Sequence, residues 1–222
     1  KHVYACATSA MRDARNSKDI IRKVKLETGI EIKVISGQEE ASFIYENHVA
    51  ENLDSDHSYL YIDVGGGSTE LNIYRNREKL ASKSFKIGSV RLLEGTEKEG
   101  DWEKMRNWIT TQKQLIPGEM EAIGTGGNIA KLFNLSKPAA EEKSMTFDAL
   151  FEMAAYVGSF SFEDRVNKLR LNTDRADVIV PAASIYLTAM ELGGCKSILV
   201  PDLGLKDGIL QMLYDRYLNR KK

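Results

Sequence analysis

The sequence contains only two cysteines and three histidines, and both kinds of residue are scattered along the chain. Cys6 and Cys195 lie far apart, without the spacing of metal ligands, and we interpret both as buried thiols of a reducing compartment. No run of about 18 apolar residues and no basic-then-apolar leader occurs, so we expect neither a membrane span nor a secretory signal. These absences predict a cytoplasmic protein.

The chain also has no excess of either positive or negative charge, because it contains 31 basic and 32 acidic residues and its net charge is −1. This balance gives no reason to expect nucleic acid or an anionic membrane as a partner, although a basic cleft can still exist locally. With 222 residues, 42% of them hydrophobic, the chain can bury the core of one large or two small globular domains.

The sequence also lacks an initial methionine. It begins at Lys1 and enters a strand-like run at residues 3–7 almost at once. A first strand needs a neighbour for its backbone hydrogen bonds, so we expect the sequence to be part of a longer chain.

What the sequence does contain is a glycine-rich turn between two apolar strands. Three consecutive glycines, Gly65, Gly66 and Gly67, remove every Cβ atom from the turn, so backbone N–H groups can converge on an anion. Ser68 and Thr69 follow them and add hydroxyl donors. The stretch therefore predicts a phosphate-binding hairpin.

A carboxylate stands on each side of this turn. Asp63 ends the first strand and Glu70 opens the second, so both face the anion from nearby. Two carboxylates would repel a phosphate unless a hard cation such as Mg²⁺ lay between them. The alternative is a glycine-rich hairpin with two solvated acids, and the presence of an acid on either side favours the cation-binding interpretation.

The spacing of apolar residues predicts alternating strands and helices. Strands are expected at residues 3–7, 30–35, 59–63, 70–73, 78–87, 120–123 and 196–200. Helices are expected at residues 8–29, 38–45 and 101–117, after a second glycine turn at 124–128, and at 146–171 in two pieces, 174–193 and 204–217. A meander with a glycine turn, followed by this order of helices and strands, indicates an α/β fold of the ribonuclease-H-like or actin-like kind.

Five blocks of sequence, taken together and in order, resemble a known family. They lie at residues 7–14, 35–41, 62–70, 124–128 and 175–181. The resemblance is to the exopolyphosphatase and guanosine pentaphosphate phosphohydrolase (Ppx/GppA) family of the actin-like superfamily. It implies an actin-like (ribonuclease-H-like) lobe with a mixed sheet flanked by helices at residues 58–222. Residues 1–57 would be a βαβα remnant of a first, truncated lobe.

The resemblance also implies roles for individual residues. Glu40 matches the carboxylate that activates the attacking water, and Asp63 and Glu70 match the positions that hold a divalent cation, Mg²⁺ or a similar ion. A glutamate near a helix start that faces a phosphate can orient and deprotonate water. The residues that match phosphate contacts are Arg12, Gly65, Gly66, Gly67, Ser68, Ser89, Gly126 and Gly127.

The implied function is hydrolysis of the terminal phosphoanhydride of inorganic polyphosphate or guanosine pentaphosphate, by a protein that can form a homodimer and needs no nucleic acid or membrane. Nothing in the sequence separates these two substrates. A second hypothesis is a non-catalytic lobe that binds polyphosphate or an alarmone, because the family's first phosphate loop is absent from these residues. For the same reason we expect slow or no turnover from the isolated chain. A sugar kinase or chaperone ATPase of the same superfamily would not explain the block around Glu40.

Overall fold

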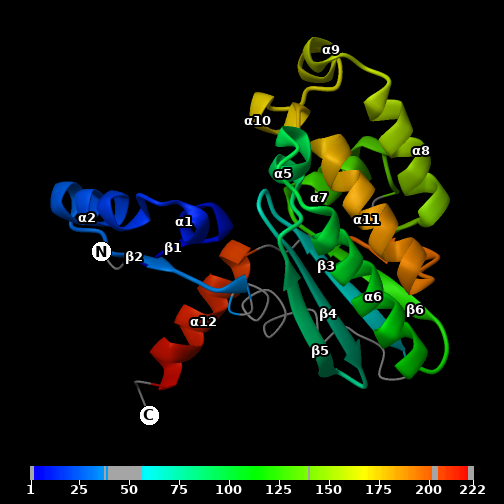
Figure 1. Cartoon of the computed structure of the whole chain (residues 1–222), viewed down its shortest axis with the longest axis horizontal. Coiled ribbons are helices and arrows are strands. Elements are labelled where there is room, and N and C mark those ends of the chain that lie inside the picture. Colours follow the sequence, from blue (N-terminus) through cyan, green and yellow to red (C-terminus); the bar gives the residue numbers. More distant parts are fainter. Residues whose placement is uncertain (1–2, 38, 40–56, 140, 202–204, 220–222) are drawn as a thin grey trace.

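The computed structural model describes residues 3–37, 39, 57–139, 141–201 and 205–219. These residues form one sheet of two strands and one of six (Figure 1). The larger sheet has the strand order β5-β4-β3-β6-β8-β7. Its strands are β3 (Ser58–Val64), β4 (Thr69–Arg75), β5 (Glu78–Phe85), β6 (Met120–Thr125), β7 (Ser144–Thr146) and β8 (Ser197–Leu199).

The strands β3, β4 and β5 form an antiparallel meander, and β3 also pairs in parallel with β6. All seven residues of β3 are buried, which agrees with its apolar sequence and its central place in the sheet. Because β3 and β6 run in the same direction, the glycine turns that follow them lie at the same edge of the sheet. The topology thus brings together two turns that are far apart in the sequence.

Seven helices of the described residues accompany this sheet: α5 (Ser89–Glu94), α6 (Glu99–Leu115), α7 (Gly127–Leu135), α8 (Phe147–Gly158), α9 (Phe162–Asn167), α10 (Thr173–Ala176) and α11 (Ile179–Gly193). An eighth, α12 (Leu205–Asn219), follows β8 and lies apart from the sheet. The helix α11 packs against α5, α6, α7, α8 and β3, and Figure 1 shows it beside α6. Fully buried small residues, among them Ala182 and Ala189, allow this close packing. The core between helices and sheet includes Leu60, Met105 and Ile109.

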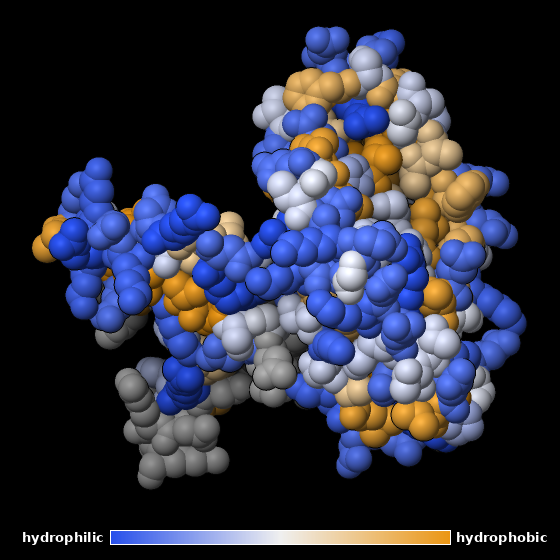
Figure 2. Space-filling view, in the orientation of Figure 1, coloured by the Kyte–Doolittle hydropathy of each residue, from blue (hydrophilic) through white to orange (hydrophobic). Residues whose placement is uncertain are grey.

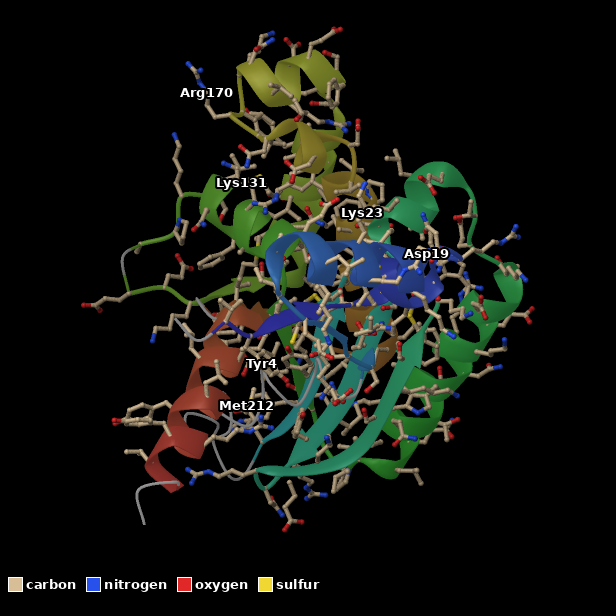
Figure 3. The ribbon with its side chains drawn as sticks, turned by 90° about the vertical axis from the view of Figure 1, so that its left-hand side faces the viewer. Tyr4, Asp19, Lys23, Lys131, Arg170 and Met212 are labelled. Atoms are coloured by element: carbon tan, nitrogen blue, oxygen red, sulfur yellow. The ribbon has the colours of Figure 1, made fainter. Side chains whose placement is uncertain are left out.

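The residues before the large sheet form a smaller βαβ unit. Its parallel strands β1 (Ala5–Ala7) and β2 (Ile32–Val34) are connected through α1 (Ser9–Asp13) and α2 (Ser17–Thr28). Gly29 ends α2 in the left-handed conformation with a φ of 71°. The helix α12 lies next to this unit in Figure 1, and in Figure 3 its Met212 lies below Tyr4, which precedes β1.

The surface visible in Figure 2 is hydrophilic over α1, α2 and the region where α5 meets α6, and more apolar along α8. The exposed apolar residues of α8 include Phe151 and Tyr156. In the described ranges no helix has both the length and the apolar character that crossing a membrane requires.

The predicted α/β fold with a mixed sheet flanked by helices is confirmed. The meander and the helix break at Gly158 are confirmed too. The prediction of one helix at residues 8–29 is wrong. The backbone is extended at Ala14, with a ψ of 125°, and a second helix begins after Asn16, a residue type that favours helix N-termini.

Short elements account for the other differences. The six-residue α5 and the three-residue edge strand β7 have no predicted counterpart, and a helix start was expected where β7 lies. The predicted helix at residues 174–193 is divided into α10 and α11. Elements of one or two turns carry too little periodicity to be recognised. Of the predicted helix at 38–45 only Glu39 lies within the described residues, and the domain boundary after residue 57 remains a prediction.

Candidate active site

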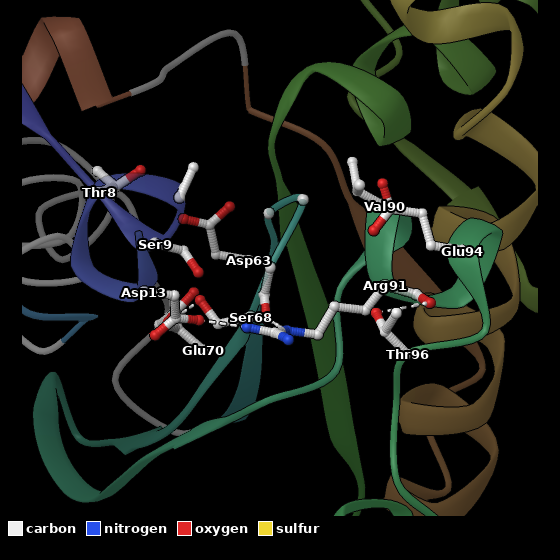
Figure 4. Close-up of a pocket in the computed structure, with 14 residues that line it drawn as sticks. Thr8, Ser9, Asp13, Asp63, Ser68, Glu70, Val90, Arg91, Glu94 and Thr96 are labelled. Atoms are coloured by element: carbon white, nitrogen blue, oxygen red, sulfur yellow. Dashed lines mark hydrogen bonds and ion pairs between the residues drawn. The ribbon is translucent and has the colours of Figure 1, made fainter. Parts of the chain in front are cut away.

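A cavity of about 320 Å³ opens beside the first glycine turn (Figure 4). Three parts of the chain form its walls, namely α1, the tip of the β3–β4 hairpin, and α5 with the loop that follows it. Asp63, Glu70, Ser68 and the three glycines of the turn all line it. The sequence therefore predicted correctly that these residues come together.

Asp63 and Glu70 are cross-strand partners in the register of β3 and β4. Because partners in an antiparallel pair project to the same face of the sheet, their side chains lie next to each other. They are only 9% and 4% exposed, respectively, so both acids are buried rather than solvated. Figure 4 shows them on the side of the hairpin that faces Ser9 and Asp13 of α1.

The carboxylate of Glu70 has several donors around one oxygen. The hydroxyls of Ser68 and Ser84 donate hydrogen bonds of 2.8 and 2.9 Å to Oε1, and Nη2 of Arg12 lies 3.9 Å from the same atom. A buried carboxylate requires such partners, because transfer from water removes its hydration. Protein donors therefore surround Oε1 of the buried Glu70 side chain.

The carbonyl groups of the glycine turn are held by the first three residues of α5. Ser89 N–H donates to the carbonyl of Gly65 over 3.0 Å, and Val90 N–H donates to that of Gly66 over 2.9 Å. Nε of Arg91 donates to the carbonyl of Gly67 over 2.7 Å. The carbonyl oxygens of the three glycines are therefore engaged, and the Gly65 N–H donates to the Ser68 carbonyl over 2.9 Å, which suits a turn whose N–H groups at Gly66 and Gly67 receive an anion.

Gly67 is required by a close approach between the turn and α1. A Cβ atom at this position would lie 2.3 Å from Oγ and 3.2 Å from Cβ of Ser9. Both contacts are shorter than a normal van der Waals separation, so any side chain here would push α1 away from the turn.

Arg12 joins the small βαβ unit to the turn. Its Nη1 donates to the carbonyl of Ile35 over 2.6 Å, and its Nη2 donates to Oγ of Ser68 over 3.4 Å. The predicted phosphate contact is therefore beside two residues of the site, Ser68 and Glu70, and orients both. A guanidinium that is about one quarter exposed still has room to meet a phosphate oxygen.

Arg91 belongs to the site although no sequence motif assigned it a role. Besides its bond to Gly67, the guanidinium forms a close ion pair with Asp13 of α1. The pair spans the cavity from α5 to α1, and Arg91 also lines the cavity. The only sequence signal was its place just after Gly88 and Ser89, where the meander was expected to end.

Two buried tyrosines connect the first glycine turn with the second. The hydroxyl of Tyr186 donates to the carbonyl of Thr125 and accepts a hydrogen bond of 3.3 Å from Val64 N–H. The hydroxyl of Tyr61 lies 2.7 Å from Oγ1 of Thr125. Burial, and then the charge of Asp63, raise the pKa of Tyr61 and of Tyr186, so both hydroxyls keep their protons.

Comparison with known proteins identifies the family. Residues 1–217 match the model of the Ppx/GppA phosphatase family. The chain belongs to this family. The resemblance that the five sequence blocks indicated is therefore confirmed.

Relatives with curated names include both kinds of Ppx/GppA enzyme. Exopolyphosphatase 1 of Mycobacterium tuberculosis H37Rv is 25% identical over 94% of this chain and 66% of its own length. The guanosine-5'-triphosphate,3'-diphosphate pyrophosphatase of Aliivibrio fischeri MJ11 is 25% identical over 97% of this chain and 45% of its own length. The chain thus spans between about half and two thirds of these relatives.

Solved Ppx/GppA structures share the fold. An exopolyphosphatase from Cytophaga hutchinsonii is 26% identical and has a TM-score of 0.80, with 97% of this chain and 75% of that chain covered. The family member from Aquifex aeolicus is 25% identical with a TM-score of 0.70, at the same coverage.

The second glycine turn, at Gly126 and Gly127, lies beside the first, since a Cβ atom on Gly126 would be 3.4 Å from Oδ1 of Asp63 and from the carbonyl oxygen of Val64. Gly127, Ser89 and Arg175 line a second cavity of about 220 Å³, which touches the first turn at Gly66. Oγ of Ser89 is within 3.4 Å of the Gly65 carbonyl. Gly126, Gly127 and Ser89, which match phosphate contacts in the Ppx/GppA family, thus lie next to the first turn, and Gly126 is close to Asp63.

Glu40, the expected catalytic base, lies outside the described residues, and its role remains a prediction. Gly37, three residues before Glu40, lies beside the site. A Cβ atom on Gly37 would lie 2.6 Å from Oε1 of Glu70. The neighbouring Glu39 accepts hydrogen bonds from Lys33 and from Ser36 N–H, which lower its pKa to about 2. Glu39 is therefore a charged surface acid, with a local partner.

The two carboxylates of the site, Asp63 and Glu70, fit Mg²⁺ better than a metal ion whose ligands all come from protein side chains. Within the described ranges no group of three or more His, Cys, Asp or Glu side chains is arranged to hold an ion. Asp63 and Glu70 supply two buried carboxylates, and Mg²⁺ usually binds one or two carboxylates together with water and substrate phosphates. Neither cysteine lines the cavity: Cys6 is partly exposed, and Cys195 is buried, which raises the pKa of its thiol to about 12.

Proposed function

We propose that this Ppx/GppA protein hydrolyses the terminal phosphoanhydride bond of inorganic polyphosphate and releases orthophosphate. The observation that carries the proposal is the buried pair Asp63 and Glu70, in register on either side of a glycine turn. Such a pair has a clear use where a cation and a phosphate share one site. The relatives named exopolyphosphatase support this substrate class.

The glycine turn receives the terminal phosphate. Its carbonyl groups are bound by residues 89–91, so the turn can present the N–H groups of Gly66 and Gly67 to the phosphate oxygens. Arg12 holds Ser68 and Glu70 in position and can itself donate to a phosphate oxygen. Fixed donors of this kind stabilise charge without reorganising during the reaction.

Asp63 and Glu70 hold Mg²⁺ in this proposal. A bound Mg²⁺ ion offsets the negative charge of the phosphates and acts as a Lewis acid on the reacting phosphoryl group. The hydrogen bonds from Ser68 and Ser84 keep one oxygen of Glu70 fixed, and the side chain can offer the other to the ion.

Glu40 is the proposed general base. It accepts a proton from water while the water oxygen forms a bond to the terminal phosphorus. The bond from that phosphorus to the bridging oxygen breaks, and its electron pair remains on the shortened chain. The products are one orthophosphate and a polyphosphate that is shorter by one unit.

The test is the release of orthophosphate by the full-length protein with Mg²⁺, with gel analysis of the remaining chains. We expect stepwise shortening of polyphosphate by single units. Guanosine pentaphosphate is assayed in parallel, because some relatives carry the name of that activity. Tight binding of polyphosphate without orthophosphate release would instead support a non-catalytic binding lobe and contradict the proposal.

A further inference from the structure

A capping box lies between β2 and the candidate active site. Gly37 and Glu39 have helical backbone, and Ser36 directly precedes them. Glu39 N–H donates to Oγ of Ser36 over 3.1 Å, and Ser36 N–H donates to Oε2 of Glu39 over 3.0 Å. Reciprocal hydrogen bonds at this spacing satisfy two backbone donors at the start of a helix and fix the direction in which the chain enters it.

A lysine holds the side chain of Glu39 from the other side. Nζ of Lys33, in β2, donates to Oε1 of Glu39 over 2.8 Å, so both carboxylate oxygens of Glu39 accept a hydrogen bond. The hydrogen bond from Lys33, and then that from Ser36 N–H, lower the pKa of Glu39 to about 2. The carboxylate is therefore charged at neutral pH, and it links the strand to the start of the helix.

The segment that Glu39 holds lies against a carboxylate of the active site. Ile35 is fully buried, and its carbonyl accepts a hydrogen bond of 2.6 Å from Nη1 of Arg12. Nη2 of the same guanidinium lies 3.9 Å from Oε1 of Glu70. A Cβ atom on Gly37 would lie 2.6 Å from Oε1 and 3.2 Å from Cγ of Glu70. Gly37 thus lies directly beside Glu70, on a segment that Arg12 and Glu39 keep in place.

We propose that Glu39 is a positioning residue for hydrolysis, whose carboxylate fixes the backbone immediately before Glu40 beside Glu70; this rests on the proposed function. Glu39 does not line the cavity of Asp63 and Glu70, so it acts through its neighbours. Its own backbone N–H is bound to Ser36, and its next peptide bond leads to Glu40. The capping box therefore sets the point from which the proposed base extends.

This role differs in its consequences from that of an ordinary surface ion pair. The side chains of Lys33 and Glu39 are about half exposed, and exposed ion pairs contribute little to stability. Displacement of a catalytic group by about 1 Å, in contrast, can lower a rate on the order of 100-fold. Loss of the capping box should therefore affect turnover more than the melting temperature.

The experiment compares Glu39→Ala with Glu31→Ala in the full-length protein. Glu31 is a matched control, because it pairs with Lys25 at 3.2 Å, also six residues away, and precedes β2 at the end opposite to Ser36. Each change removes one carboxylate and one exposed ion pair of the small βαβ unit. Orthophosphate release from polyphosphate gives kcat, KM and the half-saturating Mg²⁺ concentration, and the melting temperature is measured on the same preparation.

Glu39→Ala should lower kcat on the order of 10–100-fold, because the proposed base is no longer held in place. Both KM and the half-saturating Mg²⁺ concentration should change by less than about 2-fold, since the loss concerns the chemical step rather than binding. Glu31→Ala should leave all these quantities unchanged. Glu39→Gln should recover most of kcat, because a glutamine oxygen can still accept from Ser36 N–H in a capping box.

Ser36 provides an independent comparison if Glu39→Ala does not fold. Ser36→Ala removes the hydroxyl acceptor and should lower kcat as Glu39→Ala does, whereas Ser36→Thr keeps a capping hydroxyl and should retain kcat. Where both alanine variants fold, combining them should cause little further loss, because each breaks the same pair of hydrogen bonds.

An unchanged kcat in Glu39→Ala, or an equal loss in Glu39→Ala and Glu31→Ala, would overturn the proposal. A lower melting temperature with full kcat per folded molecule would overturn it too, because Glu39 would then be purely structural. If the unaltered protein releases no orthophosphate, the hydrolytic function is wrong and the positioning role is wrong with it. If the unaltered protein is active and Glu39→Ala matches it, the positioning role alone is wrong.

Discussion

The hydroxyl of Tyr186 donates a hydrogen bond to the carbonyl of Thr125, the last residue of β6. The same hydroxyl accepts one from Val64 N–H at the end of β3. One buried side chain on α11 thereby fixes the starting points of both glycine turns relative to each other.

Replacement of Tyr186 by phenylalanine should affect turnover as well as stability. Val64 N–H and the Thr125 carbonyl lose a buried partner, which should cost about 1–3 kcal/mol of unfolding free energy. The first glycine turn should also be less well positioned, so we expect kcat to fall on the order of 10-fold. Denaturant unfolding and steady-state kinetics measure both effects.

Tyr61→Phe is the matched control, because Tyr61 is equally buried but contacts the Thr125 side chain rather than the backbone. It should lose stability with little change in kcat per folded molecule. Equal losses of kcat in the two variants would show that Tyr186 has no special role in positioning the turns.

Gly67→Ala should separate α1 from the glycine turn, because the new Cβ atom would lie 2.3 Å from Oγ of Ser9. We expect a loss of about 1–3 kcal/mol in unfolding free energy, as for other overpacked positions. Combining it with Ser9→Ala should restore part of the loss, which a double-mutant cycle measures. Gly100→Ala, at an open position in α6, should be neutral or stabilising. Absence of coupling between positions 9 and 67 would contradict the described contact.

Glu40→Gln tests the proposed base. Glutamine keeps the size of the side chain but cannot accept the proton from water, so kcat in the full-length protein should fall by on the order of 10²–10⁴. The affinity for polyphosphate and the melting temperature should be retained. A lower melting temperature with unchanged turnover per folded molecule would instead indicate a structural glutamate.

The sequence predicts the fold well where elements are long or marked by glycine. The apolar run of β3, the turn at Gly65, Gly66 and Gly67 and the return strand β4 follow from composition and spacing alone. The division between α1 and α2 does not, because apolar residues at helical spacing continue on both sides of the extended Ala14. The contacts of Ser9 and Arg12 with the glycine turn leave no periodic signal in the sequence either.

The candidate site was predictable where chemistry is local. Asp63 and Glu70 are seven residues apart and their opposition follows from the hairpin. Arg91 and Tyr186 come from distant helices. The sequence around an arginine or a tyrosine in a helix does not indicate which carbonyl group its side chain binds.

The most direct test of the account is the Mg²⁺ dependence of orthophosphate release from polyphosphate by the full-length protein and its Asp63→Asn variant. Asp148→Asn, an exposed acid in the first turn of α8, serves as control. The account predicts that Asp63→Asn raises the half-saturating Mg²⁺ concentration on the order of 10–100-fold or abolishes activity, with the control unchanged. A folded Asp63→Asn variant with the same Mg²⁺ dependence as the unaltered protein would contradict it.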